Sequence, residues 1–116
     1  MTACTIYTGQ LNPEAVRVVN LAPLGREAEG EIRSKSNQPS TQVIFINRTA
    51  EPVERFWLDT EGKRRSYGTI GPGSVESQGT FATHAWLLTG KDGAFLGIYV
   101  PDERIGRVVI EGEGTK

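Results

Sequence analysis

Two tryptophans, a tyrosine, a threonine and the single histidine are the side chains whose types and spacing could form a ligand site. His84 and Trp86 are two residues apart in an apolar stretch, so on a β-strand their side chains point to the same face. Trp57 and Tyr67 lie on the two arms of the preceding predicted hairpin, and Thr80 comes just before the turn that leads to His84. We expect a shallow box with aromatic walls and a polar floor, which suits a compact ring with one polar edge.

Each of these residues also has an ordinary structural explanation. Trp57 and Trp86 are typical of a hydrophobic core, and Tyr67 is typical of a packed ring with its hydroxyl at the surface. A lone His84 in a strand is usually a satisfied structural residue, and Thr80 by itself indicates nothing. Composition and periodicity therefore predict an aromatic cluster in a β-protein and leave its role open.

The sequence offers little for catalysis or for metal binding. It contains one histidine and one cysteine, Cys4, and these are far apart. It lacks the His-x-x-x-His, Gly-x-Ser-x-Gly and phosphate-binding loop motifs. A single cysteine allows neither an internal disulfide nor a zinc site built on thiolates. We expect a protein that is not an enzyme and that uses no metal or cofactor.

Composition and charge indicate which classes of partner and which cellular compartment to expect. The 116 residues are 37% hydrophobic and 23% charged, which is ordinary for one globular domain. The formal net charge of −1 gives no basic face for nucleic acid. No stretch approaches the ~20 apolar residues of a membrane span, and the first residues do not resemble a signal peptide. We expect a cytoplasmic protein that binds neither nucleic acid nor membrane.

Short apolar runs separated by glycine- and proline-containing turns predict an all-β fold, an antiparallel β-sandwich of about seven short strands. The expected strands are Glu31–Ser34, Gln42–Asn47, Glu54–Asp59, Arg65–Ile70, Val75–Phe81, His84–Thr89, Ala94–Val100 and Arg107–Glu111. Two of them, Gln42–Asn47 and Ala94–Val100, are apolar on both faces, which predicts strands covered on both sides. No amphipathic helix is apparent.

The stretch from Ile32 to about Leu87 resembles the β domain of the von Hippel–Lindau tumour suppressor family. The matching pieces are Ile32-Arg33-Ser34, Gln42-Val43-Ile44-Phe45, Asn47-Arg48, Val53, Trp57-Leu58, Tyr67, Thr69, Pro72-Gly73 and His84-x-Trp86-Leu87. The resemblance weakens at Gly90–Gly93 and resumes at Tyr99-Val100-Pro101.

This resemblance suggests three segments. Residues 32–111 form the von Hippel–Lindau-like β domain, and residues 112–116 form a polar tail. Residues 1–31 are an N-terminal extension with one or two extra strands, expected at Thr5–Thr8 and Ala15–Val19. Asn12-Pro13-Glu14 fits the start of a short helix instead. Gly25–Gly30 is polar and predicts a linker or an exposed loop.

In that family the β domain binds a peptide that contains 4-hydroxyproline. The resemblance implies that Trp57 and Trp86 pack against the pyrrolidine ring, and that His84 and Thr80 hydrogen-bond its hydroxyl. Tyr67 would bond the peptide backbone. Thr80 stands where the family has serine, which keeps the hydroxyl and adds a methyl group. The implied partner is a hydroxyproline-containing peptide or protein.

Some positions depart from the family pattern. Gly79 replaces a histidine that contacts the peptide, and Phe81 replaces a tyrosine beside the pocket. Ser36 and Gln38 replace an asparagine and an arginine beside the peptide groove. The family's helical domain recruits elongin and a ubiquitin ligase. The 15 residues after Pro101 could not build that domain, so we expect no such recruitment.

Two further functions remain open. The cluster could serve as core in a non-catalytic scaffold or oligomerisation unit. Alternatively, Trp57, Tyr67 and Trp86 could stack on a sugar or another small ligand, independently of proline hydroxylation.

Overall fold

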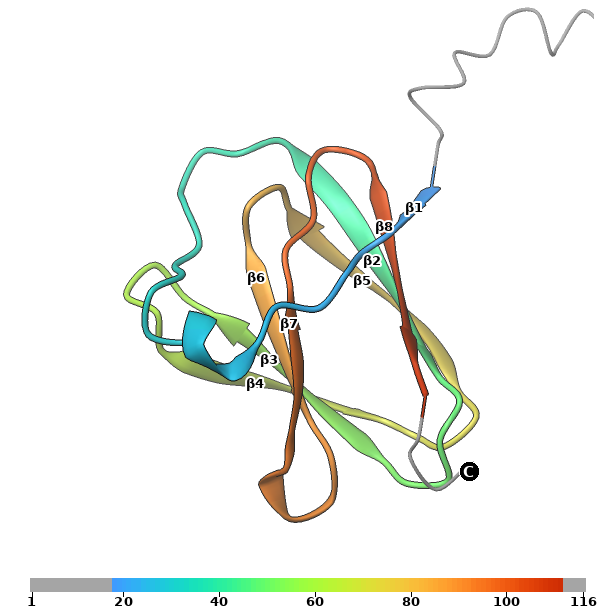
Figure 1. The fold of residues 1–116 in the computed structure, drawn as a ribbon. Helices are drawn as coiled ribbons and strands as arrows, with labels where there is room; N and C mark the ends of the chain where they lie inside the picture. Colours follow the sequence, from blue (N-terminus) through green and yellow to red (C-terminus); the bar gives the residue numbers. More distant parts are fainter. Residues whose placement is uncertain (1–17, 112–116) are drawn as a thin grey trace, which may run out of the picture.

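Residues 18–111, the part of the chain that the computed structural model describes, form eight strands and two short 3₁₀ turns (Figure 1). The elements are β1 (Val18–Asn20), η1 (Arg26–Ala28), β2 (Ser40–Asn47), β3 (Val53–Leu58), β4 (Arg64–Ile70), β5 (Val75–Phe81), β6 (Ala85–Thr89), η2 (Lys91–Gly93), β7 (Phe95–Tyr99) and β8 (Ile105–Ile110). The strand predicted at Thr5–Thr8, the alternative helix start at Asn12–Glu14, the first half of Ala15–Val19 and the tail 112–116 lie outside the described residues.

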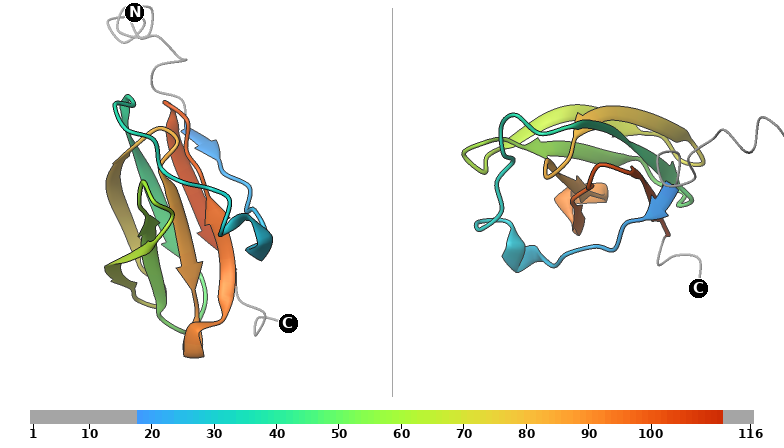
Figure 2. Two further views of the ribbon diagram at one scale, coloured as in Figure 1. Left: turned by 90° about the vertical axis from the view of Figure 1, so that its left-hand side faces the viewer. Right: turned by 90° about the horizontal axis from the view of Figure 1, so that it is seen from above.

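The strands pack as two facing sheets, which confirms the predicted all-β sandwich (Figures 1 and 2). One sheet has the order β1-β8-β2-β5 and the other has the order β4-β3-β6-β7. The pairing is antiparallel except at β8, which runs parallel to both β1 and β2. Parallel neighbours require a long connection, and here β3 to β7 lie between β2 and β8.

The core lies between the two sheets. Val43 and Phe45 of β2 and Val108 of β8 face Trp86 and Leu88 of β6, and all five are at most 2% exposed. The rings of Phe45 and Trp86 meet edge to face, with centroids 6.2 Å apart. Period-two alternation along each strand places these residues on the inner faces.

The segment that precedes β2 covers the outer face of the second sheet (Figure 2). Leu24 forms an isolated bridge with Ile98 at the β7 edge, and Ala28 and Ile32 pack against a buried cluster that includes Leu87 and Ile98. The predicted linker Gly25–Gly30 therefore contains η1 and packs on the sheet. This cover buries both faces of β6.

The strand predicted at Glu31–Ser34 is absent from the described residues, so that prediction is wrong. Ser34 is held there by its N–H, which donates to the Asp59 carbonyl, and by its hydroxyl, which donates to the Leu58 carbonyl. The residues next to Ser34 form no ladder of backbone hydrogen bonds with a strand, because the segment crosses the sandwich instead of following the edge of a sheet.

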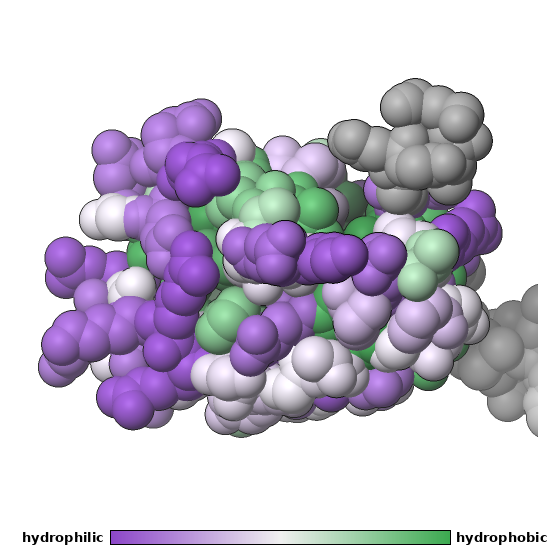
Figure 3. Space-filling model, turned by 90° about the horizontal axis from the view of Figure 1, so that it is seen from below, coloured by the Kyte–Doolittle hydropathy of each residue, from purple (hydrophilic) through white to green (hydrophobic). Residues whose placement is uncertain are grey.

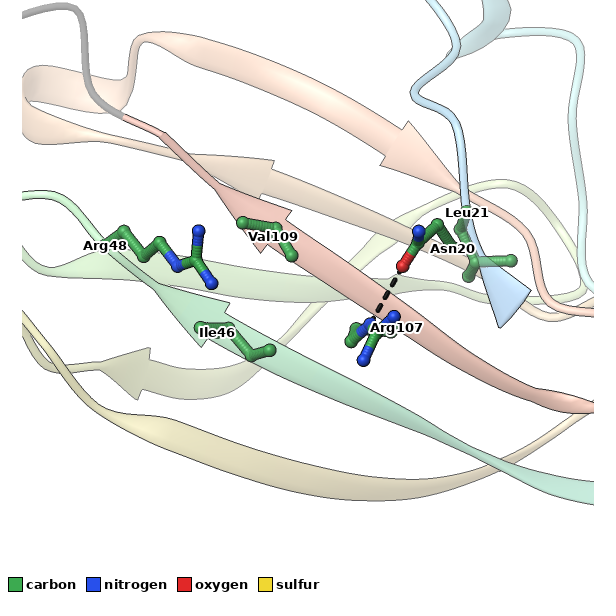
Figure 4. Close-up of a pocket in the computed structure, with 6 residues that line it drawn as sticks. All are labelled: Asn20, Leu21, Ile46, Arg48, Arg107 and Val109. Carbon is green, nitrogen blue, oxygen red and sulfur yellow. Dashed lines mark hydrogen bonds between the residues drawn. The ribbon is translucent and has the colours of Figure 1, made fainter. Parts of the chain in front are cut away.

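The prediction that Gln42–Asn47 is covered on both sides is also wrong for the described residues. Ile44 and Ile46 point away from the core and are partly exposed. Figure 4 shows Ile46 beside Val109 of β8, with Arg48 and Arg107 on either side of a shallow depression of about 390 Å³. The corresponding prediction for Ala94–Val100 holds at Gly97–Tyr99, which is buried, and is wrong at Leu96, which is 40% exposed.

A larger cavity of about 760 Å³ lies at the end of the sandwich where β2 and β6 finish. Pro52, Ala94 and Leu96 contribute to its lining, and Figure 3 shows apolar surface among hydrophilic side chains on this end. Across residues 18–111 there is no helix with the length and apolar character needed to cross a membrane.

Replacing Asn47 should strongly destabilise the fold. Its side chain is 1% exposed, and its amide donates to the carbonyls of Ile70, Glu51 and Gly71 while its oxygen accepts from Thr49. Asn47→Ala leaves buried backbone groups without partners, so we expect the free energy of unfolding to fall by about 2–4 kcal/mol.

Urea unfolding followed by tryptophan fluorescence measures this loss. The matched control is Arg48→Ala at the next, exposed position, whose ion pair with Glu111 at 3.4 Å should contribute at most about 1 kcal/mol. Equal losses for Asn47→Ala and Arg48→Ala would contradict the anchoring role of Asn47.

The β3–β4 hairpin should make stability depend on acidic pH. The Lys63 N–H, the Arg65 guanidinium and the Glu61 N–H bond the Asp59 carboxylate and lower its pKa to about 2. The unfolded chain binds this proton more readily, so the contribution is complete above about pH 4 and is lost as the pH falls through about 2. Unfolding of wild type and Asp59→Asn across this range should show a stability difference that disappears at the acidic end.

Candidate ligand-binding site

The β3–β4 hairpin positions Trp57 and Tyr67. Trp57 pairs with Trp86 on one side of β3. On the other side, the register shifts so that Tyr67 and Gly68 together oppose Arg55, which is a β-bulge. Gly68 has a φ of +97°, a conformation that favours glycine. The Arg55 guanidinium donates to the Tyr67 carbonyl at 3.1 Å and holds the bulge in place.

The turn between β5 and β6 positions Thr80 and His84. Thr80 is the penultimate residue of β5, and His84 lies in the turn before β6 begins at Ala85. The His84 N–H donates to the Phe81 carbonyl, and Thr83 has a φ of +70°. His84 therefore precedes the strand on which it was predicted, yet its ring still reaches Trp57.

The five predicted residues come together around one depression. The Tyr67 ring meets Trp86 edge to face at 5.2 Å and Trp57 at 6.4 Å, while the Trp57 and His84 rings stack at 5.6 Å with an interplanar angle of 21°. The depression has a volume of about 190 Å³ and is lined by Trp57, Tyr67, Gly79, Thr80, Phe81, His84 and Trp86.

Hydrogen bonds connect these rings to the fold. The Trp86 indole N–H donates to the Thr80 hydroxyl at 3.0 Å, and both side chains are buried. The Trp57 indole N–H donates to Nδ1 of His84 at 3.1 Å. Nε2 of His84 lies 2.9 Å from the Lys35 carbonyl oxygen. The pocket is therefore a connected arrangement and not a set of loosely adjacent rings.

The rim and the floor of the pocket differ in exposure. Tyr67 and Phe81 are 47% and 46% exposed, whereas Trp86 is 2% exposed and belongs to the core. Trp86 thus belongs to the core and also lines the pocket. The sequence identified Gly79 and Phe81 only as departures from a family pattern, although both line the pocket.

The Lys35 carbonyl was missed altogether. A backbone carbonyl has no residue-type signature, and Lys35 is far from His84 in the chain. Only the crossing of residues 33–39 over the end of the sandwich brings the two together.

The pocket lies at the open side of the sandwich. Within residues 18–111, β4 pairs only with β3 and β5 pairs only with β2, so each has an unpaired edge. Further along this side, the Arg55 guanidinium and the Glu76 carboxylate form an ion pair at 2.8 Å between the sheets. The described residues contain no group of three or more His, Cys, Asp or Glu side chains that could hold a metal ion. The pocket therefore opens beside two unpaired strand edges.

Two neighbouring substitutions on β5 should differ in their effects on stability. Thr80→Val removes the acceptor of the buried Trp86 indole and should lower the free energy of unfolding by about 1–3 kcal/mol. Gly79→Ala places its Cβ in open space, so stability should stay unchanged or rise by up to about 1 kcal/mol. Urea unfolding compares them, and a loss for Gly79→Ala equal to that for Thr80→Val would contradict this geometry.

Comparison with known proteins identifies the family. The family model described as VHL beta domain matches residues 32–95, more than half of the chain and all seven residues that line the pocket. An NMR structure of a protein from Eubacterium rectale aligns at 19% identity with a TM-score of 0.33, over 67% of this chain and 85% of that one. A TM-score of this size does not establish a common fold. The family match predicts a β-domain binding module, and the chain belongs to the von Hippel–Lindau β-domain family.

Proposed function

We propose that this protein is a non-catalytic, cytoplasmic module that binds hydroxyproline in a partner polypeptide. The pocket formed by Trp57, Tyr67, Thr80, His84 and Trp86 would hold the hydroxylated pyrrolidine ring. Membership of the von Hippel–Lindau β-domain family supports a binding module. The single cysteine of the chain is compatible with a reducing compartment.

One observation carries the proposal, which is a buried hydroxyl at the floor of an aromatic pocket. Thr80 is 6% exposed, and within residues 18–111 its side chain makes one hydrogen bond, which it accepts from the Trp86 indole. Its own proton has no acceptor among these residues. A buried donor without a partner costs about 1–3 kcal/mol, which a ligand oxygen would recover.

The aromatic walls suit the faces of a saturated ring. Trp57 and Tyr67 stand nearly perpendicular to one another, with an interplanar angle of 81°, and Trp86 closes the floor. Aromatic rings bury large apolar areas at a small cost in conformational entropy. The depression of about 190 Å³ accommodates a small ring and excludes a folded protein domain.

The unpaired strand edges supply a track for the rest of the polypeptide. An extended peptide can add to the edge of a sheet, where backbone hydrogen bonds give affinity and a neighbouring pocket gives specificity. The edges of β4 and β5 flank the pocket through Tyr67 and Gly79. Gly79 leaves open space where the family has a histidine, so we expect flanking residues of the partner to be selected differently here.

The proposal predicts strong dependence on proline hydroxylation. Two short peptides that differ only in proline or 4-hydroxyproline should differ in affinity by about 10- to 100-fold, because the unmodified ring leaves the Thr80 hydroxyl unpaired. Titration followed by amide and indole shifts of the labelled protein measures both affinities. We expect the selective shifts to centre on Trp57 and Trp86.

Two variants give the controls. Tyr67→Ala should weaken the hydroxylated peptide, whereas Leu96→Ala, exposed to a similar degree but lining the distant cavity, should leave its affinity unchanged. Equal binding of both peptides would overturn the proposal. Binding of a monosaccharide at the same residues would instead favour a glycan module, and binding of none of these probes would favour a scaffold.

A further inference from the structure

The outer faces of the two sheets differ in what covers them. On the second sheet, Leu87 and Ile98 are fully buried, and Ala28 and Ile32 of the preceding segment pack against their cluster. On the first sheet, alternate residues of β1, β8, β2 and β5 point away from the core, and within residues 18–111 all of them are exposed or partly exposed. These outward residues form what we call the outer face of the first sheet.

A row of apolar side chains crosses this outer face. Val75 of β5, Ile46 of β2 and Val109 of β8 lie opposite one another on adjacent strands, and Ile44 lies beside them on β2. Val75 is 62% exposed. β-branched residues suit any strand, so their presence alone does not indicate a partner. Side by side, however, they form a contiguous apolar patch, which is a feature of interaction sites.

The charge on the outer face has one sign. Among the outward positions of the four strands, the charged side chain is Arg107. Its Nε donates to the neutral Asn20 side chain at 2.8 Å, and no carboxylate within residues 18–111 pairs with it. The terminal nitrogens of this guanidinium, which carry most of its N–H donors, make no hydrogen bond to those residues. The outer face therefore presents a cation that has no anionic partner in the described part of the chain.

A second arginine lies at the end of the same face. Arg48 directly follows β2, and its ion pair with Glu111 at 3.4 Å joins two exposed side chains. Such a pair contributes little and exchanges readily for another carboxylate. Figure 4 shows the Arg48 side chain extending along the sheet toward Arg107, with two apolar side chains between them. The depression of about 390 Å³ thus has an apolar floor and a guanidinium on either side.

We propose that the outer face of the first sheet docks an acidic segment of a partner protein. Aliphatic side chains of that segment would cover Ile46 and Val109, and a carboxylate would bond Arg107. A guanidinium binds a carboxylate through two parallel hydrogen bonds, and apolar contacts around the pair shield it from water. This docking surface is distinct from the aromatic pocket, because the two depressions share no lining residue.

The same charges disfavour a second copy of this chain as the occupant. Two outer faces packed together would each bring Arg107 against a surface without a carboxylate among its outward strand positions. The nearest carboxylate, Glu111, is already paired with Arg48. Like charges brought together at an interface reduce affinity, so a partner of opposite charge is the better match.

Three matched peptides test the docking. One is a short peptide of leucine and glutamate, and the others carry glutamine or lysine in place of glutamate. Titration of the labelled full chain should give shifts centred on Ile46, Arg107 and Val109 with the glutamate peptide. The glutamine peptide should bind about 3- to 10-fold more weakly, and the lysine peptide more weakly still. Affinity for the glutamate peptide should also fall as salt rises, because the ion pair is near the surface.

Substitutions on the outer face separate its charge from its apolar surface. Arg107→Gln should weaken the glutamate peptide by about 3- to 5-fold and leave the glutamine peptide unchanged. Val109→Thr keeps the shape of the side chain and exchanges a methyl for a hydroxyl, so it should weaken both peptides by about 2-fold. The matched control is Arg33→Gln, at an exposed arginine that does not line the depression, which should change neither affinity.

Four outcomes would overturn the inference. The first is equal affinity for the glutamate and lysine peptides, and the second is no shift on the outer face at millimolar peptide. The third is a dependence of the Ile46 and Val109 methyl signals on protein concentration, which would indicate a second copy. The fourth is contacts from residues 1–17 to those methyls in the free protein.

The inference and the proposed function fail separately. Tyr67→Ala, in the aromatic pocket, should leave the glutamate peptide bound as in the wild type. Equal binding of proline and hydroxyproline peptides would overturn the proposed function and leave this docking surface standing. Thermal unfolding of each variant establishes that the compared proteins are folded.

Discussion

The hydrogen bond from the Trp86 indole to the Thr80 hydroxyl joins the two sheets where the pocket forms. Trp86 lies on β6 of one sheet and Thr80 on β5 of the other. Core packing against Phe45 determines the position of Trp86, and the Tyr67 ring in turn packs nearly perpendicular to Trp86. Closely packed side chains resist displacement, so the pocket acquires the rigidity of the core. The other walls are arranged around this one buried ring.

The strand edges on the two sides of the sandwich differ in how they are paired. On one side, residues 18–28 complete the fold, because β1 adds to β8 and Leu24 bridges β7. On the other side, β4 and β5 remain unpaired within the described residues. Unpaired edges invite association with other strands, and charged residues and bulges discourage it. β4 has both features, with exposed Arg64 and Arg65 and a bulge at Gly68. Its edge is therefore protected against unspecific pairing with other strands.

Residues 18–31 precede the segment that matches the family, yet they pack closely against the sandwich. A Cβ at Gly106 would lie 2.6 Å from Cδ1 of Leu21, and one at Gly97 would lie 3.0 Å from Cβ of Pro23. A side chain at Gly106 would require Leu21 to shift, and one at Gly97 would press against Pro23, so these glycines permit the crossing segment to approach. The part of the extension that the structure describes is therefore integral to the domain, and it covers the sheet that carries Trp57 and Trp86.

The sequence by itself determined most of the strands from β2 to β8 and the turns between them, because period-two alternation and turn residues are local signals. One of them, β5, was predicted at Val75–Phe81 and has those bounds. It also singled out five residues that line one depression, although Thr80 lies on β5 of the other sheet and His84 lies in a turn. The tertiary structure decided the rest. The parallel pairing of β8, the irregular path at Glu31–Ser34 and the Lys35 carbonyl at His84 all join segments far apart in the chain. Contacts of this kind depend on how the layers pack, and residue types and spacing do not encode that packing locally.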